Sequence, residues 1–202
     1  ETLLHEPGAG YWLLDGHLKR LAASAAYFGY AYDEAKVRAA LDGAVAGREG
    51  ERLRVRLLLA EDGTLTVTTA EQPVQPPDAV MRYVISDTRL DSTNAFLFHK
   101  TTRRELYDRE WQHYADTLKA DEVLYLNERG EIAEGSRTNV FVERGGKLFT
   151  PPLASGLLPG VLRSALIASG KAEEAVLTLD DLAGANNVYV GNSVRGLVKA
   201  EP

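Results

Sequence analysis

The sequence contains no cysteine in 202 residues. Without thiols, the chain has no means to form a disulfide framework, a thiolate metal site or a thiol nucleophile. We therefore do not expect a small secreted domain held together by disulfides, and we expect no metal site. A protein of the reducing cytoplasm fits this composition.

Long apolar runs and a basic surplus are also missing. No apolar run approaches the ~20 residues that a membrane span requires, and the first residues lack the charged and apolar regions of a signal peptide. Acidic residues, 29, outnumber the 23 basic ones, and the formal net charge is -6. The basic residues are scattered, whereas a nucleic-acid surface needs them clustered. We expect a soluble protein with neither a membrane nor a nucleic-acid partner.

Enough apolar residues are present for a real core. Hydrophobic residues make up 45% of the chain, which allows either one large domain or two small lobes that close on each other. The chain starts on Glu1 and enters an apolar pair at once. This start suggests that a natural N-terminal segment has been lost, fused elsewhere or not included.

The first 85 residues are predicted to form a small α+β lobe, in the order strands, helices, strands. Residues 52–60 alternate arginine with leucine or valine, which is typical of a strand with one wet face. Asp33 is a plausible N-cap for the second helix. The expected strands are 1–4, 11–14, 52–60, 65–70 and 80–85, and the expected helices are 17–29 and 33–47. Residues 86–98 are expected to link this lobe to the next.

Residues 99–202 are predicted to form a larger C-terminal lobe, which is denser in polar motifs. A helix is expected from 107 to 118 and another from 160, stopped by Gly170. Residues 178–181 resemble the capping box of a one-turn helix. The expected strands of this lobe are 123–126, 138–142, 148–150, 175–177 and 188–190.

Lys100 is the first candidate for chemistry. It opens a polar, positively charged segment that also contains Arg103 and Arg104. If this segment is helical, both arginines lie near the amine and lower its pKa, which favours attack on an aldehyde. Taken alone, Lys100 is better read as an ordinary solvated surface lysine.

Glu134 and two turns supply the groups, besides an amine, that bind a cofactor made of an aldehyde, a pyridine ring and a phosphate. A carboxylate facing a pyridine nitrogen keeps that nitrogen protonated, and Glu134 precedes a Gly-Ser turn. Phosphate is bound by helix N-termini and arginine, which are expected at 160–162, 191–193 and Arg20. Each feature also has an ordinary reading as a turn, a strand end or an exposed side chain, and that reading is favoured for each one singly. Only the whole set indicates pyridoxal phosphate.

Several motifs resemble those of the class IV pyridoxal-phosphate enzymes. They stand in the order and spacing of that family, which includes branched-chain and D-amino-acid aminotransferases and aminodeoxychorismate lyase. The resemblance covers nearly the whole chain. The motifs are residues 17–21, 99–102, 131–141, 150–152, 156–163 and 191–196.

This resemblance implies the α+β fold of two lobes known as fold type IV, with the cofactor between the lobes and usually a homodimer. Lys100 resembles the lysine that carries the cofactor covalently, and Glu134 resembles the partner of the ring nitrogen. The remaining positions imply phosphate binding by Arg20, backbone phosphate donors at Val161 and Leu162, packing of Leu158 on the ring, Arg104 near the ring hydroxyl, and a last phosphate contact at Asn192 and Ser193.

Within the family, the sequence most resembles the lyase domain fused to aminodeoxychorismate synthase component I. Residues 27–30, 98–104 and 192–196 carry this closer likeness, and a synthase component is therefore a candidate partner. The sequence departs from the family in two places. The opening strand before the Glu-Thr-Leu segment is absent, and Leu162 stands where aminotransferases often have a phosphate-binding threonine.

The resemblance implies a 4-amino-4-deoxychorismate lyase, which eliminates pyruvate and leaves 4-aminobenzoate, a folate precursor. Arg103, Arg137 and Arg195 are candidates for binding the substrate carboxylates, and each is also compatible with a surface position. The first alternative is a class IV aminotransferase, which uses the same lysine and glutamate. The second is a non-catalytic binding or assembly domain of the same fold.

Overall fold

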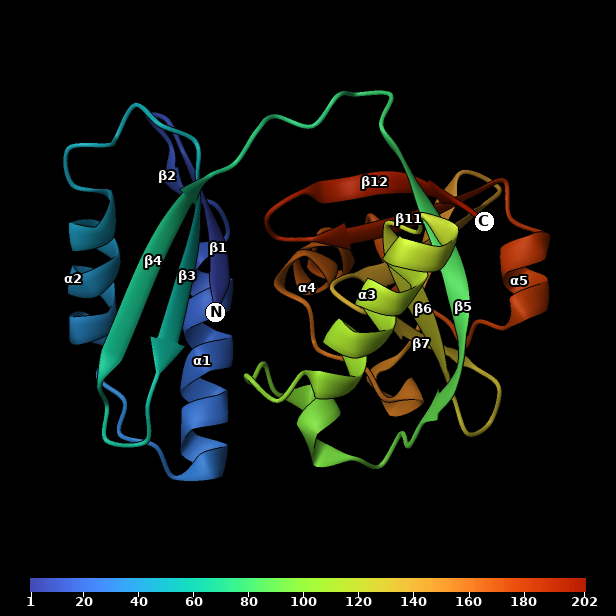
Figure 1. Cartoon of the computed structure of the whole chain (residues 1–202), viewed down its shortest axis with the longest axis horizontal. Coiled ribbons are helices and arrows are strands. Elements are labelled where there is room, and N and C mark those ends of the chain that lie inside the picture. Colours follow the sequence, from blue (N-terminus) through green and yellow to red (C-terminus); the bar gives the residue numbers. More distant parts are fainter. The chain divides into compact units, whose positions relative to one another are not determined.

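The computed structural model describes residues 1–202, and its contacts divide the chain into two compact units, Glu1–Gln75 and Pro76–Pro202 (Figure 1). Each unit combines helices with a sheet, in agreement with the predicted α+β class. The division falls earlier than the expected linker at 86–98. Strand β5 (Val80–Leu90) runs through the first part of that range and belongs to the second unit.

The polar residues of β5 explain why a strand occupies positions that were expected to form a linker. The hydroxyls of Ser86 and Thr88 both donate to the Glu110 carboxylate, at 2.5 Å each. Glu110 lies on helix α3 (Glu105–Leu118), far along the chain. A polar stretch that resembles a linker in the local sequence is thus a strand, because its hydrogen-bond partners come from a helix that packs beside it.

The Glu1–Gln75 unit is built on an antiparallel sheet of four strands. Their order is β2 (Gly10–Tyr11), β1 (Thr2–Glu6), β3 (Leu53–Leu59) and β4 (Leu65–Glu71). The alternation predicted for the third of these in the sequence is confirmed, since Leu53, Val55 and Leu57 are buried while Arg54 and Arg56 are exposed.

Two helices cover the buried face of this sheet. Leu18 of α1 (Leu14–Phe28) and Leu41 of α2 (Glu34–Val45) belong to the same apolar cluster as the buried leucines of β3. The predicted N-cap is confirmed, because the Asp33 carboxylate accepts a hydrogen bond from the Lys36 N–H at 3.2 Å. This cluster is the core of the unit.

The predicted strand at 11–14 is wrong beyond Tyr11. Helix α1 begins at Leu14, directly after Leu13, which adopts a left-handed conformation with φ 56. That backbone turn ends the extended segment and starts the helix. At its other end, α1 stops where predicted, at Gly29, whose φ of 73 suits a residue without a Cβ.

The Pro76–Pro202 unit contains a mixed sheet of eight strands. Strands β12, β5 and β6 are mutually parallel neighbours, and β10 is parallel to β9, whereas the other neighbours are antiparallel. The strands in spatial order are β10 (Ala172–Glu174), β9 (Lys147–Thr150), β8 (Asn139–Arg144), β11 (Asn187–Asn192), β12 (Gly196–Glu201), β5, β6 (Glu122–Asn127) and β7 (Ile132–Gly135).

The sequence analysis located most of these strands but missed β7 and β12. The strand expected at 175–177 is wrong, because the ladder with β9 occupies Ala172–Glu174 instead. Leu177 is apolar because its side chain is fully buried in the core, and its carbonyl accepts from the Ile132 N–H at 2.7 Å. The apolar run at 175–177 therefore reflects burial in the core and not pairing in a strand.

Helices lie on both faces of this sheet. Helix α3 contributes Leu106, Tyr107 and Trp111 to a cluster with Val123 and Tyr125 of β6. Leu182 of α5 (Leu179–Ala183) packs in the cluster on the opposite face, and the capping box predicted at Thr178 and Asp181 is confirmed. The remaining helices are α4 (Val161–Ala168) and the short 3₁₀ segments η1 (Ala95–Phe98) and η2 (Leu153–Ser155).

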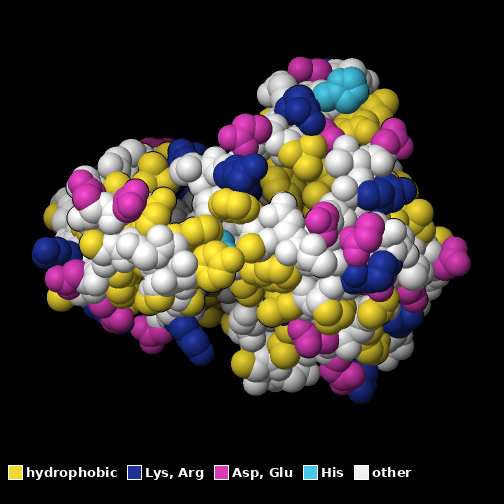
Figure 2. Space-filling view, turned by 90° about the horizontal axis from the view of Figure 1, so that it is seen from below, with side chains coloured by type: hydrophobic (Ala, Val, Ile, Leu, Met, Phe, Trp, Pro, Cys, Tyr) yellow, Lys and Arg dark blue, Asp and Glu magenta, His cyan; other side chains and the backbone are white.

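On the face drawn in Figure 2, Lys and Arg side chains are interspersed with Asp and Glu. The chain also contains exposed ion pairs, such as Lys147 with Glu173 at 3.1 Å. Such pairs add little stability because water screens them. None of the helices combines the length and apolar character that crossing a membrane requires.

Candidate active site

The centre of the candidate site is the carboxylate of Glu134 on β7. Its side chain is almost fully buried, with the residue 7% exposed. The Tyr107 hydroxyl donates to Oε1 at 2.6 Å, and the Leu158 N–H donates to Oε2 at 2.8 Å. A strand and two flanking segments therefore fix both oxygens of this acid.

Burial raises the pKa of Glu134 to about 7, and this effect outweighs the polar and charged groups nearby that favour the carboxylate form. The hydrogen bonds from Tyr107 and Leu158 lower the pKa, and so do the positive charges of Arg104 and Lys100. The hydrogen-bonding partners are neutral groups. A cationic donor placed against Glu134 would complete the pairing of this buried charge.

Lys100 lies in the partly buried, irregular segment between η1 and α3. The segment is not helical, so the expected crowding of Lys100 by Arg103 and Arg104 at helical spacing is wrong. Because the Lys100 charge acts on Glu134, the structure brings these two predicted residues into one electrostatic neighbourhood.

Arg104 stands directly before α3 and faces the turn that follows Glu134. Its Nη2 donates to the Ser136 carbonyl at 2.6 Å, and its guanidinium carbon lies 5.3 Å from the centre of the Tyr107 ring. The exposed Asp108 carboxylate lies 3.5 Å from its Nε. Arg104 thus joins α3 to the turn between β7 and β8.

Glu122, which the sequence analysis did not single out, organises this turn from inside. It is 1% exposed, and it accepts hydrogen bonds from the hydroxyls of Ser136 and Thr138, the latter at 2.8 Å. The Val123 N–H donates to it as well, at 2.9 Å. A buried acid with this set of donors fixes the backbone between Glu134 and β8.

The start of α4 lies beside the same site. Gly160 is the N-cap residue and provides no capping side chain, so Val161 and Leu162 begin the helix with backbone N–H groups that no side chain caps. Asn139 holds the approach to this helix, because its Nδ2 donates to the Leu158 carbonyl at 3.0 Å. The predicted phosphate donors are therefore at a helix N-terminus, next to the segment that contacts Glu134.

The turn after β11 contains Asn192 and Ser193. The Asn192 side chain accepts from the N–H groups of Val194 and Arg195, at 3.0 Å each, and donates to the Arg137 carbonyl at 3.1 Å. Its amide is therefore used to shape the turn and to tie it to the β7–β8 turn. Ser193 is buried beside it.

Arg20 belongs to the Glu1–Gln75 unit and is described there by itself. Its Nε and Nη2 donate to the two oxygens of Glu1, at 2.9 and 2.6 Å, and His17 Nδ1 lies 2.8 Å from the same carboxylate. Burial opposes ionisation of Glu1, yet the charge of Arg20 holds the pKa of that carboxyl well below its ordinary value.

The candidate carboxylate-binding arginines have different surroundings. The guanidinium carbon of Arg137 lies 3.9 Å from the centre of the Trp111 ring, and that of Arg103 lies 4.5 Å from the Phe96 ring. Arg195 Nη1 lies 3.8 Å from the Met81 sulfur. Burial lowers the pKa of Arg137, the nearby Glu122 carboxylate opposes this effect, and the charge of Arg104 adds to it.

Comparison with known proteins places this geometry in a family. A family model described as amino-transferase class IV matches residues 1–201. The chain belongs to this family.

Relatives within class IV have more than one described activity. The chain is 32% identical over 210 residues to a Schizosaccharomyces pombe protein described as "Putative aminodeoxychorismate lyase", covering 98% of this chain and 87% of that one. A Mesorhizobium loti structure described as "Putative amino-acid aminotransferase" is 44% identical with a TM-score of 0.94, covering 100% and 97%. A Legionella pneumophila structure described as "Putative 4-amino-4-deoxychorismate lyase" shares the fold, at 22% identity and a TM-score of 0.87, covering 99% and 80%.

The residues of this class IV chain fit pyridoxal phosphate. Glu134 is a buried carboxylate whose raised pKa calls for a cationic donor, which a protonated pyridine nitrogen supplies. Lys100 provides an amine in the same neighbourhood, and the uncapped α4 N-terminus suits a phosphate.

Sequence reasoning missed Tyr107 and Glu122 for the same physical reason. Tyr107 was assigned only to the apolar stripe of a helix, and Glu122 stood at the edge of a predicted strand. The Tyr107 hydroxyl reaches Glu134, 27 positions away, and Glu122 accepts from Ser136, 14 positions away, and no local pattern reveals such partners.

Proposed function

We propose that this chain is a pyridoxal-phosphate-dependent 4-amino-4-deoxychorismate lyase, which releases pyruvate and 4-aminobenzoate. The observation that carries the proposal is the likeness to the S. pombe protein, which extends over 98% of this chain. The Glu134 site supports it, because a lyase of this kind needs an acid for the ring nitrogen and an amine for proton transfer.

When bound, the cofactor would supply an aldehyde for the substrate amine and a pyridinium ring that accepts electrons. Lys100 would hold the cofactor through its amine, and the same amine would take the proton from the substrate carbon that bears nitrogen. Glu134 keeps the ring nitrogen protonated. Tyr107 and the Leu158 N–H orient the carboxylate for this task.

The elimination is balanced without another reactant. One proton leaves the ring carbon that bears nitrogen, and the carbon–oxygen bond to the enolpyruvyl group breaks. The released enolate gains one proton on its carbon and becomes pyruvate. The remaining ring becomes aromatic, which drives the reaction forward.

The remaining residues have proposed roles in binding. Backbone groups of Val161 and Leu162 hold the phosphate with Ser193, Leu158 packs on the ring, and Arg104 lies near the ring hydroxyl. For Arg20, phosphate binding stays a prediction from the resemblance. Asn192 acts by shaping the turn that presents Ser193. Among the arginines considered for the substrate carboxylates, Arg137 is the best supported, because it is partly buried and stacks on Trp111.

Two measurements test this function. Purified protein mixed with pyridoxal phosphate should show a visible absorbance band, and Lys100→Ala should lack this band. A non-catalytic domain would not show the band even with Lys100 in place. With 4-amino-4-deoxychorismate and no keto acid, the wild-type protein should release pyruvate and 4-aminobenzoate in equal amounts over many turnovers. Product that stops at one equivalent per site contradicts the lyase assignment.

A class IV aminotransferase is the second candidate, favoured by the 44% identity to the M. loti chain described as a putative aminotransferase. It would use Lys100 and Glu134 in the same positions but would require a keto acid to regenerate the cofactor. Consumption of an amino donor that depends strictly on added keto acid supports this candidate over the lyase.

A homodimer in the cytoplasm, and association with an aminodeoxychorismate synthase component, stay predictions from the resemblance. Light scattering of the purified protein gives the oligomeric state directly. Co-purification with a synthase component tests the partner.

A further inference from the structure

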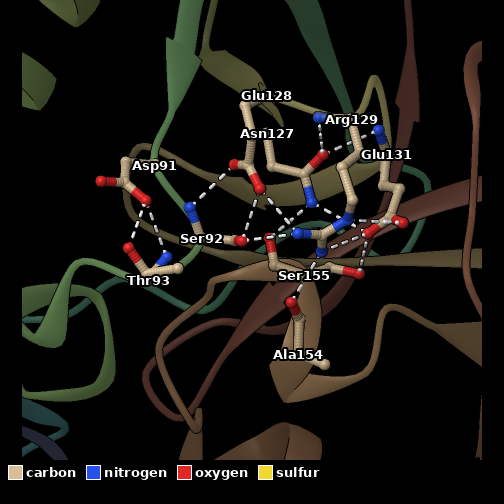
Figure 3. A network of polar contacts seen from close by, with 9 residues as sticks. All are labelled: Asp91, Ser92, Thr93, Asn127, Glu128, Arg129, Glu131, Ala154 and Ser155. Carbon is tan, nitrogen blue, oxygen red and sulfur yellow. Dashed lines mark hydrogen bonds and ion pairs between the residues drawn. The ribbon is translucent and has the colours of Figure 1, made fainter.

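A dense polar cluster surrounds Arg129, in the turn between β6 and β7 (Figure 3). Its Nη1 donates to the Ser92 hydroxyl at 2.7 Å and to Glu128 Oε1 at 2.6 Å. Its Nη2 donates to the Ala154 carbonyl and to Glu131 Oε2, at 2.8 Å each. One guanidinium therefore joins its own turn to two segments that are far away in the sequence.

Each of these segments leads to a residue of the candidate active site. Glu131 directly precedes β7, which carries Glu134. Ala154 lies in η2, and Leu158 follows four positions later with the N–H that donates to Glu134. From Ser92 the chain passes through η1 to Lys100.

Further hydrogen bonds join the same segments. Asn127 Nδ2 donates to the Ser155 carbonyl at 3.0 Å, and the Ser155 hydroxyl donates to Glu131 Oε2 at 2.9 Å. Ser92 is held twice by Glu128, through its N–H at 2.9 Å and its hydroxyl at 2.7 Å. Both serines are buried, and the bond from Asn127 to the Ser155 carbonyl is shielded from water.

The backbones of two of the segments also meet in close contact. Gly156 has a φ of +82, and a Cβ at this position would lie 2.6 Å from the Ser92 Cα and 3.2 Å from Leu97 Cδ1. The segment before Leu158 therefore rests directly on the segment before Lys100. Such contact transmits a displacement of one segment to the other.

We propose that Arg129 is a positioning residue that fixes the segments bearing Lys100, Glu134 and Leu158 relative to one another, through Ser92, Glu131 and Ala154. The inference rests on the proposed function, because the three residues are taken to act on one cofactor. Arg129 itself does not contact the site.

The planar fork of arginine is essential to this role. A guanidinium presents several N–H groups in fixed directions, whereas a lysine ammonium is a point charge on a flexible stem. Hydrogen bonding to Arg129 and Asn127 lowers the pKa of Glu131 to about 2. The partner acid is therefore charged throughout the neutral range, and the cluster holds its geometry there.

The test compares Arg129→Ala and Arg129→Lys with Arg144→Ala. Arg144 is a matched control, because its side chain is 39% exposed against 44% for Arg129, and it forms an ion pair with Asp181 at 2.6 Å on another part of the unit. Cofactor-free protein is examined by hydrogen exchange of peptides 91–100 and 153–160. Protein with pyridoxal phosphate is examined by the pH midpoint of its visible band and by kcat and KM.

Arg129→Ala should exchange faster in both peptides, shift the pH midpoint and lower kcat about tenfold, with KM changed less than about twofold, because misplaced groups affect the chemical step. Arg129→Lys should fall between it and the wild type, and Arg144→Ala should match the wild type. Faster exchange with an unchanged midpoint and kcat overturns the positioning role. A wild-type protein without any visible band instead overturns the proposed function, and the exchange arm alone then decides whether Arg129 joins the two segments.

Discussion

At the scale of single residues, Glu134 combines deep burial with neutral hydrogen-bonding partners. Its pKa in the folded protein is about 7, against an ordinary value of 4.5. Between these values the folded state binds more protons than the unfolded state, so the free energy of unfolding falls as pH rises. The carboxylate is therefore a cost to the cofactor-free fold at neutral pH.

Because of Glu134, we expect the free energy of unfolding to fall by about 3 kcal/mol as the pH rises from about 5 to about 8. Glu134→Gln should remove this pH-dependent fall, because the amide does not titrate. The measurement is urea unfolding of both cofactor-free proteins at the two pH values. An identical pH dependence in the two proteins would contradict the assignment.

Tyr107→Phe tests the partner of that acid. The Tyr107 hydroxyl lowers the pKa of Glu134 by donating to Oε1, so its removal should raise that pKa further and extend the pH-dependent loss of stability to higher pH. The same urea series, continued to alkaline pH, measures the shift. Tyr114→Phe on the same helix is the control and should leave the pH dependence as it is in the wild type.

The candidate residues themselves could be predicted from the sequence, but their relations could not. Lys100 and Glu134 were identified by their motifs, whereas the Tyr107 hydroxyl and the Leu158 N–H were not connected with Glu134. These contacts join a helix, a strand and a turn. Their geometry exists only after the elements have packed.

At the scale of elements, the turn between β7 and β8 depends on a single buried acid. Glu122→Gln should lower the free energy of unfolding by about 3 kcal/mol, because the new amide group would face donors where an acceptor is needed. Chemical denaturation measures this loss. Glu143→Gln is the matched control, since Glu143 accepts from Asn187 and Tyr189 in a partly buried position and should cost less.

Elements with strong periodicity were predictable, and elements stabilised by distant partners were not. The alternation in β3 and the capping residues of α2 and α5 identified those elements correctly. The second half of β5 was taken for a linker, because Glu110, which pairs with its hydroxyls, lies on α3. Strand β7 is short and buried along its whole length, so it shows no alternation.

At the scale of the whole molecule, each unit has its own apolar core. Leu41, on α2, is 1% exposed in the core of the Glu1–Gln75 unit. Leu41→Ala should lower the free energy of unfolding by about 3 kcal/mol, because it leaves a cavity. Urea unfolding checks this value, and Arg38→Ala, in an exposed position on the same helix, should change it by less than about 0.5 kcal/mol.

Two units of mixed helix and strand could be expected from the order of predicted elements, and the family resemblance gave the fold itself. The order of strands in the larger sheet could not be read from the sequence. It depends on the parallel pairing of β5 with β6 on one side and with β12 on the other. No periodicity specifies which strand becomes the neighbour of which.

Strand β12, residues Gly196–Glu201, lies inside the larger sheet, between β11 and β5. The two halves of that sheet are therefore joined by β12, which follows both of its neighbours in the sequence. Until those residues emerge, β5 has an open edge that is able to pair with another chain. The sheet of this unit cannot be completed before β12 has been made, and its slow step should be the pairing of β12 with β5, since contacts between distant segments form slowly.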